Sequence, residues 1–353
     1  MRWAKLCSGA RYNLATSGIE SLPLAELPVR MEELELSAHG SYGYRPLLER
    51  IAARYRVPAE CVVEATGTSM ANHLAMAATL EPGDEVLIEA PAYGLLAELA
   101  EYLGARVERF ARRFEDGFAI DLDALRRKLS NRTRLIVLTN LHNPSGMEAP
   151  ESLLQELGGI AERVGAKVLV DEVYLEMDYN RPGRTIFSPD GPFLVTSSLT
   201  KAFGLSGLRC GWVLAEAALA EKMWRINDLY GVNPATIAQQ LSTIAFDHLD
   251  AIAARARRML TENRALLKNF VGTRREIETV WPEAGTILFA RLRDGQGEGF
   301  CNVLREKYEV SVVPGRFFEM PEYFRVGVGG ETEMVRASLA QLGHALDRLS
   351  CAN

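Results

Sequence analysis

The sequence has few cysteines and no long apolar run, and each of these absences excludes a class of protein. The cysteines are odd in number and form no C-x-x-C pair, which argues against a disulfide framework or a zinc site and predicts reduced thiols in the cytoplasm. They are Cys7, Cys61, Cys210, Cys301 and Cys351. No apolar run approaches membrane-spanning length, and residues 1–18 lack the apolar core of a secretory signal. We therefore expect neither membrane association nor export.

Charge and histidine patterns argue against nucleic acid and metal as ligands. The formal net charge is −6, so the chain has no broad basic surface of the kind that binds phosphate backbones. The run at 255–260 (RARRML) is interpreted as the solvated face of a helix. His73, His142, His248 and His344 show no metal-ligand spacing, so no metal site is expected.

The pattern of apolar segments predicts an α/β fold. Of the 353 residues, 48% are hydrophobic and 24% are charged, which is ordinary for a globular protein with a large and a small domain. Between residues 62 and 214, strands that are apolar throughout alternate with helical patterns, as in a parallel sheet covered on both faces. The expected strands span residues 61–66, 85–90, 134–140, 167–174, 193–198 and 210–215. A long helical stretch is expected over 235–270, followed by a smaller α+β lobe.

The segment SSLTKAFGLSGLRCGW contains the first candidate functional residue, Lys201. A lysine in such a loop is most often a solvated cation. Ser198 and Arg209 flank this one, however, and a hydroxyl and a guanidinium both suit a phosphate group. These three residues therefore predict a site at which Lys201 meets a phosphate-bearing ligand.

The spacing S-x-x-K, with an arginine eight residues after the lysine, resembles the cofactor motif of the class I/II aminotransferases, which are fold-type I pyridoxal-phosphate enzymes. The resemblance implies that Lys201 binds pyridoxal 5′-phosphate covalently and serves as the catalytic base. VLVDEVY and NLHNPSG match two more motifs of the family and supply Asp171, Tyr174 and Asn143. In the family, the aspartate pairs with the pyridine nitrogen, and the tyrosine and asparagine bind the phenolic oxygen. Taken singly, Asp171 could be a strand-end charge and N-P-S-G an ordinary turn.

The resemblance also assigns the remaining parts of the site. Thr68 and Ser69 open a helix whose first N–H groups suit the phosphate, although a simple helix cap is the alternative. Tyr93 matches the aromatic residue that stacks on the cofactor ring, with a core or interface tyrosine as the alternative. Arg325 in FRVGVGG matches the arginine that binds the substrate α-carboxylate, with a surface ion pair as the alternative. Gly18 falls where the family has a glycine lining the substrate entrance.

The resemblance covers about residues 13–349 and implies the architecture. We expect a large domain with a mostly parallel sheet of the seven-stranded type between helices, and a smaller α+β domain. Residues 35–265 would form the large cofactor-binding domain, and residues 266–353 the small one, joined by residues 1–34. Family members are usually homodimers, so we expect a homodimer.

The sequence departs from the family pattern at one tyrosine. In the family, this tyrosine reaches the phosphate bound by the neighbouring subunit. Its position falls here near Ala38 or His39. Tyr42 and Tyr44 lie nearby, so the residue that takes this role is left open.

These features predict an aminotransferase that moves an amino group between an α-amino acid and a 2-oxo acid, with no nucleic-acid or membrane partner. A lyase, decarboxylase or racemase of the same fold is the alternative, because all of them share the cofactor apparatus. A ligand-sensing regulator is less favoured, since the chain is acidic and no helix-turn-helix segment precedes the domain. No second arginine is placed to bind a dicarboxylate, so the side chain of the amino donor stays open.

Overall fold

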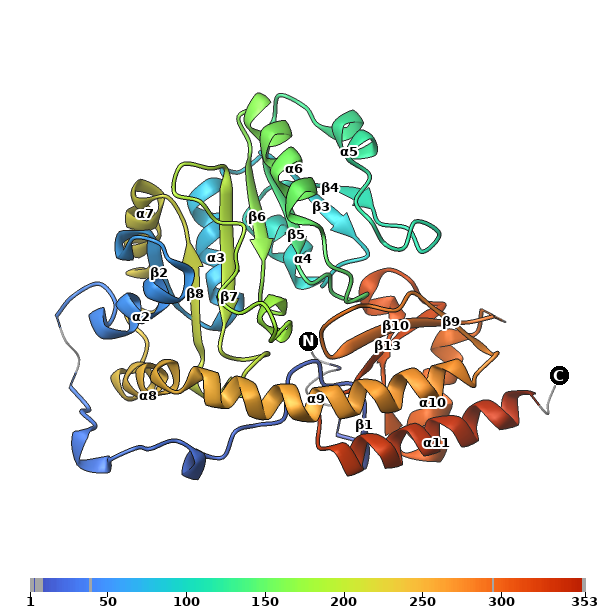
Figure 1. Cartoon of the computed structure of the whole chain (residues 1–353). Coiled ribbons are helices and arrows are strands. Elements are labelled where there is room, and N and C mark those ends of the chain that lie inside the picture. The colour runs from blue at the N-terminus through green and yellow to red at the C-terminus, as the bar shows by residue number, and fades with distance from the viewer. Residues whose placement is uncertain (1–2, 4–8, 38–39, 294, 351–353) are drawn as a thin grey trace.

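The computed structural model describes Trp3 and residues 9–37, 40–293 and 295–350. Cys7, Cys351, Ala38 and His39, which the sequence analysis singled out, lie outside the described residues. Figure 1 shows a large sheet with helices on both sides and, beside it, a smaller lobe that contains the C-terminal helix.

The large sheet has seven strands, of which six are parallel. In order across the sheet they are β2 (Val62–Thr66), β8 (Cys210–Leu214), β7 (Phe193–Ser198), β6 (Lys167–Asp171), β5 (Thr133–Thr139), β3 (Glu85–Ala90) and β4 (Arg106–Ala111). Only β8 runs against its neighbours, β2 and β7. The predicted mostly parallel sheet is therefore confirmed.

Both faces of this sheet are buried, which explains why its strands are apolar throughout. Val168 and Val170 point into one core, whereas Leu169 between them points into the other. One face is covered by α3 (Gly67–Thr79), α4 (Leu95–Tyr102) and α7 (Ala217–Asn227). The other face is covered by α2 (Arg45–Tyr55), α5 (Leu122–Lys128), α6 (Glu151–Arg163), α8 (Thr236–Asp247) and the first part of α9 (Leu249–Gly272).

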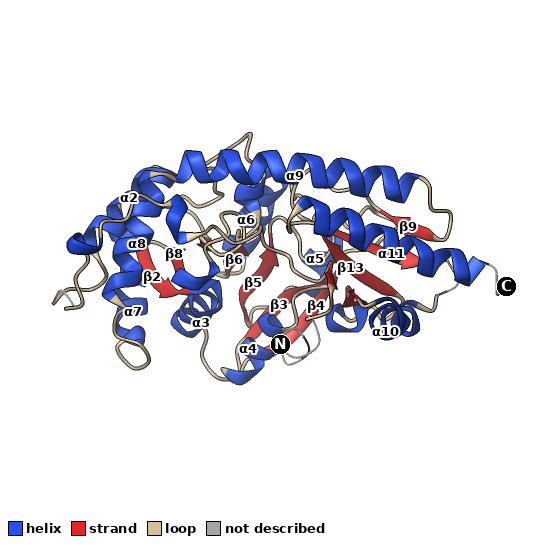
Figure 2. Cartoon of the chain, turned by 90° about the horizontal axis from the view of Figure 1, so that it is seen from below, coloured by secondary structure: helices blue, strands red, loops and turns tan. Residues whose placement is uncertain are grey.

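The smaller lobe is built on an antiparallel sheet. Its strands are, in order, β12 (Val313–Pro314), β13 (Tyr323–Gly327), β10 (Ile287–Leu292) and β9 (Ile277–Thr279), and its helices are α10 (Gly297–Tyr308) and α11 (Thr332–Ser350). Near the N-terminus, β1 (Tyr12–Asn13) pairs with β11 (Val310–Ser311). In Figure 2, α9 extends along both parts of the molecule, and the predicted domain boundary at residue 265 falls inside it.

Short 3-10 helices occur in the connections. They are η1 (Leu24–Glu26), η2 (Met31–Glu33), η3 (Ala59–Cys61), η4 (Leu175–Met177), η5 (Ser206–Leu208) and η6 (Gly315–Phe318). Within the described ranges, no helix is both long and apolar enough to cross a membrane.

Several elements differ from the sequence-based expectation: the strand expected over 167–174 ends at Asp171, and β1 and β9 were not expected. Two further differences have a clear cause. The edge strand β4 was missed because its sequence, RVERFA, is charged and largely exposed, as is common for edge strands. The stretch at 235–270 forms two helices, because the backbone leaves the helical conformation at His248 (φ −118°, ψ 16°) between α8 and α9.

Candidate active site

A cavity of about 440 Å³ lies at the carboxyl ends of the parallel strands, where open α/β sheets commonly bind ligands. It is lined by nine of the eleven residues that the sequence predicts for the site: Thr68, Ser69, Tyr93, Asn143, Asp171, Tyr174, Lys201, Arg209 and Arg325. Ser198 and Gly18 are not among the lining residues, but both contact residues that are. The structure therefore brings the predicted residues together, while their roles stay predictions.

One end of the cavity suits an anion. Helix α3 begins at Gly67, and its N-cap residue, Thr66, makes no side-chain cap hydrogen bond to the described residues. The exposed N-terminal N–H groups and the positive end of the helix dipole favour a phosphate. The Thr68 Oγ1 donates to Ser198 Oγ at 2.9 Å, so the two hydroxyl groups lie next to each other at this end of the cavity.

Arg209 supplies the cationic group at this end. Its backbone is left-handed (φ 50°), and its guanidinium donates to the Thr66 carbonyl at 3.4 Å. A side chain on Gly67 (φ +75°) would overlap this guanidinium, so glycine is required where the arginine crosses the start of the helix. Within the described ranges Arg209 forms no ion pair, which leaves its charge available to a ligand.

Lys201 is held by residues from distant parts of the chain. Its Nζ donates to Ser17 Oγ at 3.3 Å, and Ser17 Oγ lies 2.8 Å from the Tyr174 hydroxyl. A side chain on Gly18 would contact the Lys201 Cδ at an ordinary 3.5 Å, so this glycine is not sterically required. Ser17 was missed by the sequence analysis, because nothing in ATSG shows that this segment returns to a lysine 184 residues away.

Asp171 is 5% exposed, and its carboxylate accepts hydrogen bonds from the Asn72 Nδ2 at 2.9 Å and from the Val173 N–H at 3.1 Å. Asn72 is in turn fixed by Thr196, whose Oγ1 donates to it at 2.6 Å. Burial raises the pKa of Asp171 to about 6, although these hydrogen bonds and the charge of Lys201 oppose the rise. Asn72 was also missed; the available signal was a polar residue on the buried face of an apolar helix.

Arg325 is a buried cation without an acidic partner among the described residues. It is 7% exposed, and its guanidinium donates to Asn143 Oδ1 at 2.7 Å and to the Ala15 carbonyl at 3.3 Å. Its Nε has no hydrogen-bond partner within the described ranges. The surface ion pair considered as its alternative role is therefore wrong. A buried guanidinium of this kind costs free energy unless an anion pairs with it, so this wall of the cavity suits a carboxylate.

The turn that carries Asn143 rests on a buried polar network. The Arg112 guanidinium donates to Glu89 at 2.8 Å, and both side chains are inaccessible to solvent. Glu89 also accepts the Thr139 N–H at 2.6 Å. His142 bridges Ser145 Oγ (2.6 Å) and the Pro91 carbonyl (2.8 Å), and burial and the Arg112 charge lower its pKa well below the usual range. His142 is therefore a structural residue of the turn.

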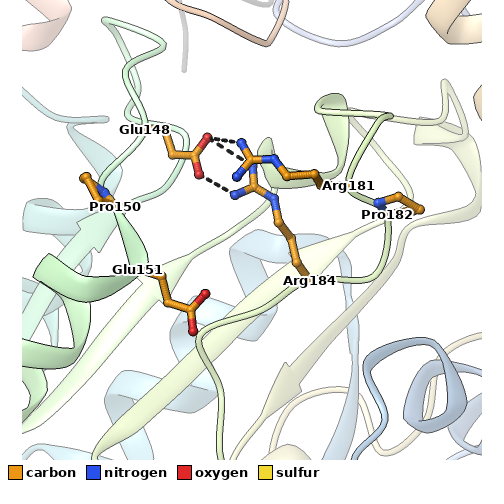
Figure 3. Close-up of a pocket in the computed structure, with 6 residues that line it drawn as sticks. All are labelled: Glu148, Pro150, Glu151, Arg181, Pro182 and Arg184. Atoms are coloured by element: carbon orange, nitrogen blue, oxygen red, sulfur yellow. Dashed lines mark hydrogen bonds and ion pairs between the residues drawn. The ribbon is translucent and has the colours of Figure 1, made fainter.

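Another cavity lies at the surface, where the loop before α6 meets the loop that follows η4. Figure 3 shows the Glu148 carboxylate facing the guanidinium groups of both Arg181 and Arg184. Asp178 also pairs with both arginines. Because these charges neutralise one another, this cavity offers little to a charged ligand, and the chemistry belongs to the cavity around Lys201.

The chain is similar to known proteins over most of its length. The family model for aminotransferase class I and II matches residues 30–342. Capreomycidine synthase from Streptomyces vinaceus is 31% identical over 96% of this chain and 90% of its own. Histidinol-phosphate aminotransferase 1 from Mesorhizobium japonicum is 28% identical over 94% of this chain and 91% of its own. A crystal structure of a PLP-dependent aminotransferase from Streptococcus suis superposes with a TM-score of 0.90 at 28% identity, covering 98% of this chain and 96% of that one.

The chain therefore belongs to the aminotransferase class I and II family. The predicted fold class, the dependence on pyridoxal 5′-phosphate and the prediction of an aminotransferase are confirmed at the level of this family. The lining residues fit the cofactor: an amine for its aldehyde (Lys201), a carboxylate for its ring nitrogen (Asp171), and Arg209 with the start of α3 for its phosphate. Arg325, which has no acidic partner among the described residues, is not needed for any of these three contacts.

Proposed function

We propose that this enzyme transfers the amino group of an α-amino acid to a 2-oxo acid, with Lys201 as the base and Arg325 as the carboxylate-binding residue. The observation that carries the proposal is a buried guanidinium, unpaired with any acidic residue in the described part of the chain, in the same cavity as a lysine amine. A substrate carboxylate would neutralise Arg325 through a bidentate pair.

The residues that line the cavity have separate roles in this reaction. Pyridoxal 5′-phosphate, when bound, supplies an electron sink for the negative charge that develops at the substrate Cα. Lys201 Nζ takes a proton from that Cα as general base. Asp171 keeps its partner nitrogen protonated, and Arg325 orients the substrate by its carboxylate. Tyr174, whose hydroxyl lies 2.8 Å from Ser17 Oγ, would hydrogen-bond the phenolic oxygen of the cofactor.

A different pyridoxal-phosphate reaction on the same scaffold is the second candidate. It is favoured by one observation, which is that the 31% identical relative from Streptomyces vinaceus carries the name of a synthase rather than of an aminotransferase. The residues that hold the cofactor do not distinguish between these reactions.

A half-reaction distinguishes the two candidates. We expect the holoenzyme, given a panel of amino acids and no acceptor, to release one 2-oxo acid per active site and then stop. The long-wavelength absorption of the cofactor should fade, and addition of a 2-oxo acid should restore it. Continuous release of product without an acceptor, with unchanged absorption, would instead indicate a lyase or decarboxylase; inversion of the substrate would indicate a racemase.

The proposal includes a homodimer in the cytoplasm. Large apolar side chains are exposed on the N-terminal segment and on the loop between α7 and α8: Leu24, Met31, Leu36, Leu229, Tyr230 and Val232. The Glu35 N–H of the N-terminal segment donates to Gln240 at 2.9 Å, on the helix α8 that follows this loop. An apolar surface of this kind favours a protein partner, and a second copy of the chain would cover it. The free, buried thiols of Cys61, Cys210 and Cys301 are in keeping with a reducing compartment.

Light scattering coupled to gel filtration tests the homodimer. We expect twice the mass of the chain for the wild type, and a shift toward the monomer for Leu229→Asp, because a charge in an apolar interface is strongly unfavourable. Tyr102→Asp is the matched control, since Tyr102 is as exposed as Leu229 (79% each) but lies on α4, outside this set. A wild type with the mass of one chain would contradict the proposal.

A further inference from the structure

We infer that the substrate of this enzyme carries a positively charged side chain, which Glu98 on α4 recognises at the mouth of the active site. The inference rests on the proposed function, because it takes Arg325 as the partner of the substrate carboxylate. It adds the chemical class of the amino acid, which the sequence motifs leave open.

The charges that line the cavity lead to this conclusion. Lys201, Arg209 and Arg325 are the basic residues in its described lining, and Asp171 and Glu98 are the acidic ones. Four of these five have a partner in the cofactor or in the substrate carboxylate. Glu98 is left over, and no basic residue of the described lining remains for an acidic side chain. The charge without a partner is therefore the negative charge of Glu98, which favours a substrate with a cationic side chain.

The position of Glu98 is fixed by the helix that carries it. Leu96 and Ala100 on the same helix are buried in the core, while the Glu98 side chain is exposed at the cavity. Its Oε1 lies 3.9 Å from where a Cβ would stand on Gly94, which also lines the cavity. Among the described residues, no basic side chain forms an ion pair with Glu98, so the carboxylate is available.

Tyr93 connects Glu98 with the centre of the site. Burial raises the pKa of the Tyr93 hydroxyl, and the negative charges of Asp171 and Glu98 raise it further, whereas Arg325 lowers it. One hydroxyl therefore lies within electrostatic reach of the carboxylate proposed to bind the ring nitrogen, of the carboxylate-binding arginine, and of Glu98. Arg325, Tyr93 and Glu98 all line the same cavity, so a substrate held by Arg325 would extend its side chain within this cavity toward Glu98.

The cavity also has aromatic lining residues, which suit a long aliphatic chain with a cationic head. Trp3 and Phe317 both line the cavity, with their ring centroids 5.6 Å apart. Methylene groups pack on such rings, and a guanidinium or ammonium group is attracted to their faces. The nearby cation Arg316, which lies over the Phe317 ring, is already paired with Glu298, so it does not supply the missing charge for Glu98.

Arginine and citrulline provide the test, because they have nearly the same shape and differ in the charge of the side chain. We expect the holoenzyme to use arginine with a higher kcat/KM than citrulline, and to use aspartate poorly. Glu98→Gln should lower the ratio of the two kcat/KM values by roughly fivefold or more, as expected for the loss of one partly exposed ion pair. Glu101→Gln removes the same charge from the same helix, but away from the cavity, and should leave the ratio unchanged.

A binding measurement separates this inference from the proposed reaction. Calorimetric titration of the holoenzyme with 5-guanidinopentanoate and with its neutral isostere 5-ureidopentanoate reports recognition of the side chain without turnover. Tighter binding of the guanidino compound, lost in Glu98→Gln but kept in Glu101→Gln, supports the inference even if no amino transfer is detected. Equal binding of the two compounds by the wild type, or a preference that Glu98→Gln does not reduce, overturns it even if transamination is confirmed.

Discussion

Lys201→Ala should abolish covalent attachment of pyridoxal 5′-phosphate and lower turnover by roughly 10³- to 10⁴-fold, the range that loss of a general base with a covalent role produces. The cavity would keep its other contacts, because Lys201 Nζ forms a hydrogen bond only to Ser17 among the described residues, at 3.3 Å. The variant should therefore fold and still bind cofactor through Arg209 and the start of α3.

The measurement is reduction with borohydride followed by peptide mass spectrometry. In the wild type we expect a pyridoxyl group on the peptide that contains Lys201 and no label at that position in Lys201→Ala. Lys167→Ala serves as the control, since Lys167 forms a surface ion pair with Glu216 at 3.3 Å, and such pairs contribute little. A label on any lysine other than Lys201 would contradict the assignment.

The residues that were predictable from the sequence stand in short motifs at the ends of strands. Asp171 ends β6, and Lys201 follows β7 by three residues; parallel strands deliver such positions to one edge of the sheet. The local sequence motifs and their order along the chain were sufficient to predict that these residues belong to the site. The same is true of the central strands, whose apolar runs follow from burial on both faces.

The residues that were not predictable reach the cavity from segments without a local signal. Ser17 arrives because β1 pairs with β11 in the other lobe, a contact between residues far apart in the sequence. Asn72 and Glu98 lie on helices. The rotation of a helix about its axis, once it has packed on the sheet, decides whether a polar residue on it faces solvent or the site. The packing of α3 turns Asn72 toward Asp171. The helix propensities of the neighbouring residues do not predict this orientation.

Asp171→Asn separates the chemical role of this residue from a structural one. We expect turnover to fall by roughly 10²- to 10³-fold, as on removal of one preorganised electrostatic partner, because an amide does not hold the ring nitrogen protonated. The fold should persist. The Asp171 site has two hydrogen-bond donors, Asn72 Nδ2 and the Val173 N–H, and rotation of the Asn72 amide lets the new side chain satisfy both neighbours.

The cofactor-free protein should become more stable through this substitution. The pKa of Asp171 is about 6 in the folded state, against 3.8 for an unperturbed carboxyl group, so the folded state binds the proton more tightly. Below pH 3.8 the buried carboxyl group therefore does not lower the free energy of unfolding. As the pH rises from 3.8 toward 6 it lowers this free energy increasingly, and above pH 6 the decrease reaches its full value of about 3 kcal/mol. The gain in melting temperature of cofactor-free Asp171→Asn over wild type should grow across this pH range and then level off.

Glu172→Gln is the matched control, because Glu172 is the next residue and is buried as well, but does not line the cavity. Burial raises its pKa to about 8, so at neutral pH the protonated acid is already close to an amide in charge. Its Oε1 accepts the Ile186 N–H at 2.9 Å, which a glutamine also does. We expect Glu172→Gln to keep nearly full turnover while Asp171→Asn loses it; equal turnover in the two variants would show that Asp171 acts only as a buried structural carboxylate.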